Sequence, residues 1–219
     1  MINNKNFYSS ATSSRECIGP HREDILSTLV GGLLGDCSAE KRSNATRFFF
    51  HASSKNVRYI RSLHKLFADN GYCNPKIPDI RKEIGQNNKI CYVVRFKTYS
   101  FTSLNYLYDA FYDEHKLKFV PVKIEQLLTN RALAIWIMVD GGRFGEGLKL
   151  STDGFTVEDV HLLQEAVYNR FKIRPTVQRH KGSRVLSFVK ADREGVLNLV
   201  KGIIDDSMLY KFRFKYKKR

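Results

Sequence analysis

Hydrophobic and polar positions follow two different periods along the chain, and the order of these periods predicts its elements. In SKNVRYIRSLHKLFADNGY, apolar residues recur at Val57, Ile60, Leu63 and Phe67, the spacing of one helix face. In ICYVVRFKTYS, residues 90–100, apolar and polar residues alternate over the central positions, the period of a half-buried strand. The chain is therefore expected to combine helices and strands in one mixed fold.

The predicted strand at 90–100 has two unlike faces. Tyr92, Val94 and Phe96 fall on one face, which we expect to be buried. Arg95 and Lys97 fall on the other face, so the open side of the strand is expected to be basic.

The second half of the chain repeats the order of elements in the first half. Thr129 is a plausible N-cap for the helix NRALAIWIMVD, and two glycines end it. Strand, helix, two strands and a helix then follow, as after the helix expected from Pro20 to Asp36. We expect an α/β (α+β) fold in three parts: a flexible arm at 1–20, a first half at 21–121, and a second half at 122–219 that includes a basic tail.

Each half contains one apolar helix that is expected to end on an aspartate. LVGGLLGDC and LAIWIMVDG can be superimposed, with Asp36 and Asp140 both at the eighth place. A glycine inside a helix costs about 1 kcal/mol relative to alanine, so the glycines need a packing reason. Gly31 and Gly35 lie four apart and share a face, so the two helices are expected to pack there. The candidates to fill the gap come from the second helix: Ile135, Trp136 and Val139.

This packing would bring the two aspartates together at one end of the helix pair. Two carboxylates that close repel each other unless a divalent cation lies between them. An acid at the negative end of a helix dipole is also unfavourable. The duplicated placement of Asp36 and Asp140 therefore favours metal binding over two unrelated helix-end acids.

The overall charge indicates a polyanionic partner. The 219 residues contain 37 Lys and Arg against 22 Asp and Glu, a formal net charge of +15. Nucleic acid is the leading explanation, although ribosomal and membrane-surface proteins share this signature. No apolar run is long enough for a membrane span, and the four cysteines lack zinc-ligand spacing. We expect a soluble chain with free thiols in a reducing compartment.

The residues from about Asp24 to Phe212 resemble the LAGLIDADG homing endonucleases in their single-chain, two-motif form. LAIWIMVDGG is similar to that family's LAxWFMDDGG signature, and FTVEDVHLLQ and SMLYKF lie where its members carry similar runs. The resemblance implies two pseudo-symmetric αββαββα halves with saddle-shaped antiparallel sheets. It also implies that Asp36 and Asp140 hold Mg²⁺, or another divalent cation, against the scissile phosphates.

The same resemblance assigns one catalytic lysine to each half. Lys118 and Lys211 occupy these positions, and an ammonium there would stabilise negative charge that develops on the phosphate. A solvated surface lysine is the common alternative, and Lys116 and Lys123 are close enough in sequence to compete with Lys118.

The implied reaction is metal-assisted hydrolysis of double-stranded DNA, with a staggered double-strand break in a long asymmetric site. Because one chain carries both halves, we expect a monomer. The candidate DNA-binding residues on strands are Arg47, Arg95 and Lys97 in the first half and Lys149, Gln178, His180 and Arg184 in the second. The candidate phosphate contacts from loops are Lys41, Arg42, Arg143 and Lys181.

Two other functions fit the same sequence. An intron-encoded maturase could use this scaffold to bind group I intron RNA without cutting DNA. A DNA-binding regulator with an inactive site is disfavoured because both Asp36 and Asp140 are present. The resemblance further suggests an organellar location, in a mitochondrion or chloroplast.

Overall fold

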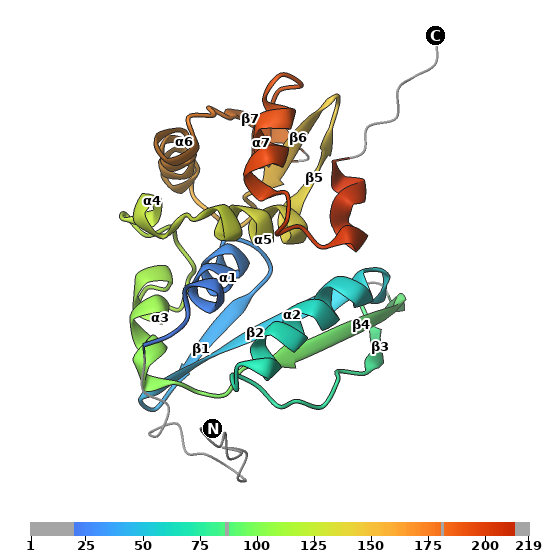
Figure 1. Ribbon diagram of the computed structural model, residues 1–219. Coiled ribbons are helices and arrows are strands. Elements are labelled where there is room, and N and C mark those ends of the chain that lie inside the picture. Colours follow the sequence, from blue (N-terminus) through green and yellow to red (C-terminus); the bar gives the residue numbers. More distant parts are fainter. Residues whose placement is uncertain (1–19, 86–87, 181, 213–219) are drawn as a thin grey trace, which may run out of the picture.

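Two four-stranded antiparallel sheets form the frame of the molecule, and helices pack on one face of each (Figure 1). The computed structural model describes residues 20–85, 88–180 and 182–212. The predicted arm up to residue 19, the tail after Phe212 and the candidate contact Lys181 lie outside the described residues.

The first half has the order helix, two strands, helix, two strands, helix. Its sheet has the strand order β1-β2-β4-β3. Its helices are α1 (Glu23–Leu33), α2 (Val57–Asp69) and α3 (Asn105–Phe111), with short 3-10 turns η1 (Ser54–Asn56) and η3 (Thr102–Leu104). Its strands are β1 (Ser38–Arg42), β2 (Ala45–Ser53), β3 (Ile80–Ile84) and β4 (Ile90–Lys97).

The second half repeats this order after one short helix, α4 (Ile124–Leu127). Its sheet order, β5-β6-β8-β7, has the same connectivity as the first. Its other helices are α5 (Asn130–Asp140), α6 (Val157–Phe171) and α7 (Asp192–Val200), followed by the 3-10 segment η4 (Asp206–Lys211). Its strands are β5 (Gly141–Phe144), β6 (Gly147–Ser151), β7 (Thr176–His180) and β8 (Ser183–Phe188). The predicted pair of αββαββα halves is confirmed.

The core of the first half follows from strand alternation. Phe48 and Phe50 of β2 and Val94 of β4 are at most 3% exposed, and they share the sheet face on which α2 packs. Phe67 of α2 packs against this face with its ring tilted relative to that of Phe50, at a centroid distance of 5.2 Å. Tyr92 was expected on the buried face and lies there by register, yet it is 52% exposed. It pairs with Lys82 of β3, toward the end of the hairpin that the helix does not cover.

The second half is built in the same way on β6 and β8. Leu148, Leu150, Leu186 and Phe188 share one sheet face and are almost completely buried beneath helices that include α6. The predicted N-cap of α5 is confirmed, since the Thr129 hydroxyl accepts a hydrogen bond from the Ala132 amide at 3.1 Å. These caps and apolar faces determine where each helix begins and what it packs against.

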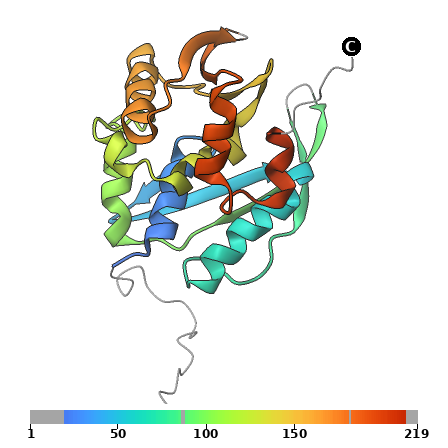
Figure 2. The ribbon, with the colours of Figure 1, turned by 45° about the horizontal axis from the view of Figure 1, so that its top comes forward.

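The two halves meet through α1 and α5, which lie side by side at the centre of the molecule in both views (Figures 1 and 2). Within the described ranges, no helix is both long and apolar enough to span a membrane. The central helix pair therefore joins the sheets, and its ends determine where residues of the two halves can meet.

Candidate active site and nucleic-acid-facing surfaces

Close contact between α1 and α5 depends on the missing side chain at Gly31. A Cβ added there would lie 2.3 Å from the carbonyl oxygen of Ala132 and 2.8 Å from the Cβ of Ile135. A Cβ added at Gly35 would lie 2.9 Å from a methyl carbon of Val139. Ile135 and Val139 therefore face the two glycines, whereas Trp136, the third candidate, is fully buried in the core.

The expectation that the first motif helix continues to Asp36 is wrong. Helix α1 ends at Leu33, and Gly35 and Asp36 lie in the turn that leads into β1. The turn is closed by hydrogen bonds from the amides of Gly35 and Cys37 to the carbonyl of Gly32. Only Gly31 and Gly32 therefore lower the helix propensity of α1. Gly35 contacts Val139 of α5 from the turn.

The aspartates of the two halves come together at this end of the helix pair. Asp140 is the last residue of α5, and one of its carboxylate oxygens lies 3.0 Å from the Cβ position at Gly35, the neighbour of Asp36. Burial, followed by the nearby Asp36 carboxylate, raises the pKa of Asp140 to about 7. Asp36 itself is exposed. The structure thus places one half-buried and one exposed carboxylate close together.

Two lysine side chains, Lys118 and Lys211, lie near these carboxylates. The Lys118 ammonium donates to the carbonyl oxygens of Gly35 at 3.0 Å and Cys37 at 2.8 Å. The Lys211 ammonium donates to the carbonyls of the last turn of α5 and is 7% exposed. Burial lowers the pKa of Lys211 to about 8, although Asp140 and Asp36 oppose that shift. Burial also lowers the pKa of Lys118.

These ammonium groups explain how Asp140 can stand at the negative end of α5 and Asp36 just beyond that of α1. Cations near helix C-termini bind the free carbonyls and offset the dipole. Neither α1 nor α5 has a basic residue in its own last turn, so the cation comes from a distant segment in each half. The two carboxylates therefore lie among compensating positive charges.

The donor set fits a divalent cation. Mg²⁺ and Ca²⁺ prefer carboxylate and carbonyl oxygens, and Mg²⁺ commonly takes one or two carboxylates and completes its shell with water and substrate phosphate. Asp36 and Asp140 supply two carboxylates; the pKa of Asp140 is raised first by burial and then by the Asp36 carboxylate, whose negative charge a cation would offset. Among the described residues, no group of three or more His, Cys, Asp or Glu residues has the arrangement of a metal site, here or elsewhere, so this site offers only the two carboxylates.

The sheet of the first half has a polar face opposite α2, which we call the first polar face. Arg47, Arg95 and Lys97 lie on it by register, as expected from strand alternation. Two of these cations are ion-paired: Arg47 with Glu40 at 2.7 Å, and Arg95 with Glu83. The face therefore mixes cations with acids on neighbouring strands rather than carrying bare positive charge.

Lys41 and Arg42 were expected in a loop, and this expectation is wrong because both belong to β1. Arg42 alternates onto the first polar face and pairs with Glu40. Lys41 alternates onto the opposite face, where its ammonium lies 2.8 Å from the Asp109 carboxylate of α3. The structure therefore does not bring Lys41 to the surface that carries Arg47.

The sheet of the second half has a corresponding second polar face. Lys149, Gln178 and His180 lie on it together, and His180 packs edge-on against the Phe144 ring with centroids 5.3 Å apart. A small pocket of about 140 Å³ on this face is lined by Lys149 and His180, among other residues. The structure therefore brings these three candidates together.

Arg143 and Arg184 depart from the expected placement. Arg143 is in β5 rather than in a loop, and by register it shares the face of Leu148. Arg184 of β8 pairs with Arg179 and shares the face of Leu186. The alternation that places Lys149 on the polar face excludes both arginines from it.

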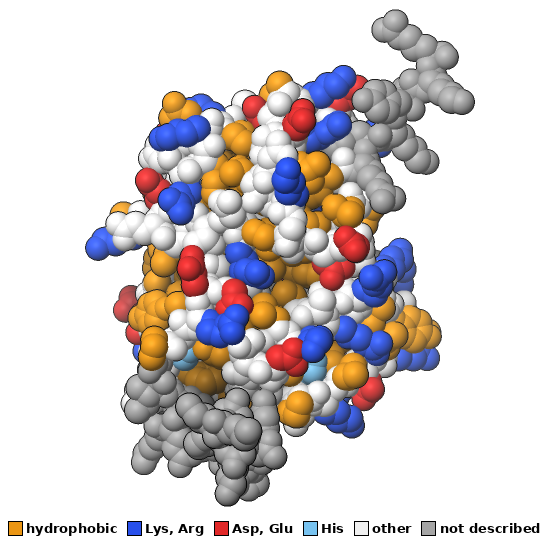
Figure 3. Space-filling view, in the orientation of Figure 1, with side chains coloured by type: hydrophobic (Ala, Val, Ile, Leu, Met, Phe, Trp, Pro, Cys, Tyr) orange, Lys and Arg blue, Asp and Glu red, His pale blue; other side chains and the backbone are white. Residues whose placement is uncertain are grey.

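Two residues of the first polar face were missed. His51 pairs with Arg95 across β2 and β4, and Arg81 of β3 pairs with Val93, so both share that face and both are exposed. His51 was regarded as incidental, although counting in steps of two from Arg47 along the strand leads directly to it. Figure 3 shows the side of the molecule on which α2 lies, and there Lys and Arg side chains gather near the hairpin of β3 and β4.

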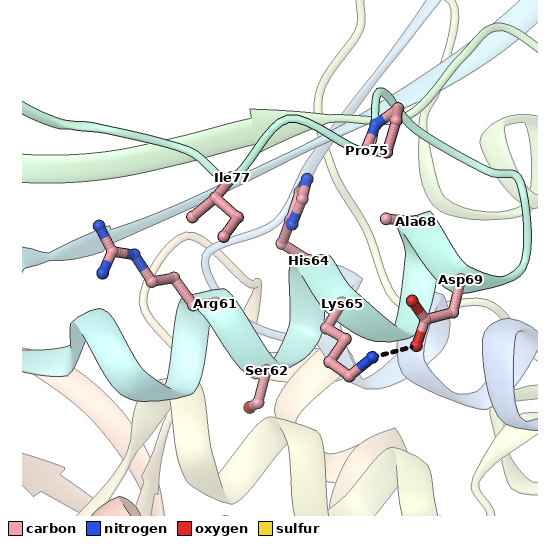
Figure 4. Close-up of a pocket in the computed structure, with 8 residues that line it drawn as sticks. All are labelled: Arg61, Ser62, His64, Lys65, Ala68, Asp69, Pro75 and Ile77. Carbon is pink, nitrogen blue, oxygen red and sulfur yellow. Dashed lines mark hydrogen bonds and ion pairs between the residues drawn. The ribbon is translucent and has the colours of Figure 1, made fainter.

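A larger pocket, of about 760 Å³, lies away from these groups, on α2 and the segment before β3 (Figure 4). Arg61, His64 and Ile77 border it, and Lys65 there is ion-paired with Asp69. None of the candidate catalytic residues lines it. Its position on the covering helix separates it from the carboxylates.

Comparison with known proteins agrees with this architecture. Residues 26–194 match the model of the LAGLIDADG DNA endonuclease family. The chain is 35% identical over 204 residues to the cytochrome b mRNA maturase bI2 of Saccharomyces cerevisiae, covering 89% of this chain. It spans only about half, 48%, of that maturase. It is 32% identical over 158 residues to the intron-encoded endonuclease ai4 of Dictyostelium discoideum, covering 70% of this chain and 99% of the relative.

A solved structure has the same fold. The homing endonuclease I-WcaI, bound to its DNA recognition sequence, superimposes with a TM-score of 0.83 and 23% identity over 93% of this chain and 92% of the other. The family match, the Dictyostelium relative and the two-sheet fold agree, and the chain belongs to the LAGLIDADG DNA endonuclease family.

Proposed function

We propose that the protein is a site-specific homing endonuclease that makes a staggered double-strand break in a long asymmetric DNA site. The observation that carries this proposal is the meeting of Asp36 and Asp140, one from each half, at the end of the α1–α5 pair. Each half also carries its own polar sheet face. A duplex that lies along both faces would have its two strands presented to the paired carboxylates.

In this proposal Asp36 and Asp140 hold Mg²⁺ or another divalent cation. The cation would supply Lewis-acid stabilisation of the charge that develops on the scissile phosphate. The chain's own residues position the DNA and balance charge: the two carboxylates face the phosphates, and Lys118 and Lys211 lie behind them. Preorganised cations of this kind are effective because they need no rearrangement as charge develops.

The DNA would be held through the two polar faces. A twisted antiparallel ribbon fits the major groove, where base edges can be distinguished. Arg47, Arg95 and Lys97 are the proposed contacts in the first half, with Lys149, Gln178 and His180 in the second. Because the two faces carry different residues, the target need not be palindromic, and a single chain suffices.

A second function, assistance of intron splicing, is favoured by one finding: the yeast relative is named a cytochrome b mRNA maturase. Retained carboxylates do not argue against it, because an RNA-binding role needs the scaffold rather than the acids. The two functions can be distinguished by measuring binding of the host intron RNA and cutting of DNA that lacks the intron.

We also propose an organellar, reducing compartment. The free thiols of Cys37, Cys73 and Cys91 are consistent with it.

The test replaces each carboxylate by its neutral isostere. Asp36→Asn and Asp140→Asn should each abolish double-strand cleavage of an intronless duplex in Mg²⁺ while binding of that duplex persists, because removing negative charge does not weaken attraction to phosphate. Cleavage is read on gels and binding by fluorescence anisotropy. Asp79→Asn, the same change at an exposed loop residue, is the control. Near-parental cutting by either site variant at saturating Mg²⁺ would defeat the proposal.

A further inference from the structure

The two lysines behind the carboxylates are equivalent by position in the sequence but not by hydrogen bonding. The Lys211 ammonium donates to three successive carbonyl oxygens of α5: Ile137 at 3.1 Å, Met138 at 2.6 Å and Val139 at 3.1 Å. A lysine ammonium has three N–H donors and no acceptor. All donors of Lys211 are therefore used within the protein, at a site that is 7% exposed.

Lys118 is bonded differently. Its ammonium donates to only two carbonyls, those of Gly35 and Cys37, which flank Asp36. No third acceptor for it exists among the described residues, and its side chain is only partly buried. Lys118 therefore keeps one donor that an incoming phosphate oxygen could accept from.

The last turn of α5 explains why Lys211 is fully engaged. Helix C-termini leave carbonyls without intrahelical donors, and a left-handed glycine often satisfies them. Gly141 instead continues in an extended conformation, at φ −73° and ψ 151°, because it begins β5. The Gly141 amide still donates to the Ile137 carbonyl, so Lys211 is the donor on which the Met138 and Val139 carbonyls depend. These two residues directly precede Asp140.

We propose that Lys211 is a positioning residue, which fixes the Asp140 end of α5, and that Lys118 alone of the pair contacts the scissile phosphate. This inference rests on the proposed endonuclease function. If Lys211 turned to the phosphate, it would leave buried carbonyls unpaired, which is costly. The two halves then contribute unequally to the reaction despite their matching order of elements.

The experiment compares Lys118→Met with Lys211→Met, since methionine approximates the length of the side chain but lacks the ammonium. Single-turnover rates for each DNA strand are measured on an intronless duplex over a range of Mg²⁺ concentrations, below the melting temperature of each variant. The parental chain and Lys123→Met, at an exposed position outside the site, are the controls. Melting temperatures and DNA affinity are recorded for all four proteins.

For Lys211→Met we expect the Mg²⁺ concentration at half-maximal rate to rise about tenfold, the usual effect of losing a group that orients a metal ligand. Saturating Mg²⁺ should restore the maximal rate to near the parental value, with DNA affinity unchanged. For Lys118→Met the maximal rate should remain down about a hundredfold at saturating Mg²⁺, the usual effect of losing one donor to the reacting group.

The inference is overturned if Lys211→Met loses maximal rate as Lys118→Met does, without a change in Mg²⁺ dependence. If Lys211→Met does not fold, Lys211→Gln, which retains two N–H donors for the carbonyls, is measured in its place. It should raise the Mg²⁺ requirement by less than about tenfold and keep a near-parental maximal rate, and a loss of maximal rate without a change in Mg²⁺ dependence overturns the inference. If the parental chain cuts no intronless duplex, the proposed function has failed. The positioning role is then judged by the rise in melting temperature with Mg²⁺, which must be smaller in Lys211→Met, or in Lys211→Gln if that variant does not fold, than in Lys118→Met for the inference to stand.

Discussion

At the scale of single residues, the glycines of α1 report how close the two central helices are. Replacing an interior helix glycine by alanine should stabilise the helix by about 1 kcal/mol on propensity alone. At Gly31 the added Cβ would meet the backbone oxygen of Ala132 at 2.3 Å, and backbone cannot move aside as a side-chain tip can. We therefore expect Gly31→Ala to lower the melting temperature, with overpacking that costs about 1 to 3 kcal/mol, and Gly31→Leu to lower it further.

Gly32 provides the matched control in the same helix. A Cβ there would meet only side chains, Cys37 and Phe50, both at 3.0 Å. Gly32→Ala should therefore destabilise less than Gly31→Ala in the same thermal melts. A Gly31→Ala protein that melts above the parental chain and cuts normally would show that α1 and α5 are not in backbone contact.

The packing role of Gly31 could be predicted from the sequence because spacing along a helix fixes which residues share a face. The end of the helix could not be predicted. Gly35 and Asp36 fit the helical period, but hydrogen bonds from two amides to one carbonyl, that of Gly32, turn the chain after Leu33. Such a turn depends on where β1 must start, which local periodicity does not encode.

At the scale of elements, strand register decides which cations can reach a nucleic acid. Alternation along β4 correctly placed Arg95 and Lys97 together, because period two is a local property of a strand. It could not reveal that Glu83 of β3 and Glu40 of β1 would pair with Arg95 and Arg47, since pairing between strands depends on the sheet order. Lys41 and Arg143 were misplaced for a simpler reason: the short strands that contain them, β1 and β5, were not predicted, and these residues were assigned to loops.

The same register makes a prediction about specificity. Arg95→Ala should relax base preference in one half-site only, by about 1 to 3 kcal/mol of discrimination at the affected position, if Arg95 reads bases. Lys82→Ala is the matched control, because Lys82 lies in the adjacent strand but alternates onto the opposite face. Both variants are compared by cleavage of a library of single-base target variants. Equal relaxation by the two substitutions, or relaxation spread over both half-sites, would contradict the assignment of the first polar face.

At the scale of the whole molecule, the formal charge of +15 and the ion pairs on the sheets act in opposite directions. A cation that neutralises phosphate releases condensed counterions, so affinity falls steeply with salt. Arg47 and Arg95 are ion-paired with Glu40 and Glu83. Each ion pair must break, or the arginine must contact the acid and a phosphate together, before the arginine can neutralise that phosphate. The number of phosphate contacts should therefore be well below the number of excess cations, while specificity can still come from the paired arginines.

With about six phosphate contacts, affinity for the duplex should fall on the order of a thousandfold between 50 and 200 mM salt. Fluorescence anisotropy over this range measures the slope, and analytical ultracentrifugation of the complex should find one chain per duplex, because both halves are in one chain. Glu83→Gln provides a directional check: freeing Arg95 from its acid should tighten non-specific binding and steepen the salt slope. A flat salt response would rule out phosphate as the main partner. An unchanged slope in Glu83→Gln would place Arg95 away from the bound DNA, even if the parental slope is steep.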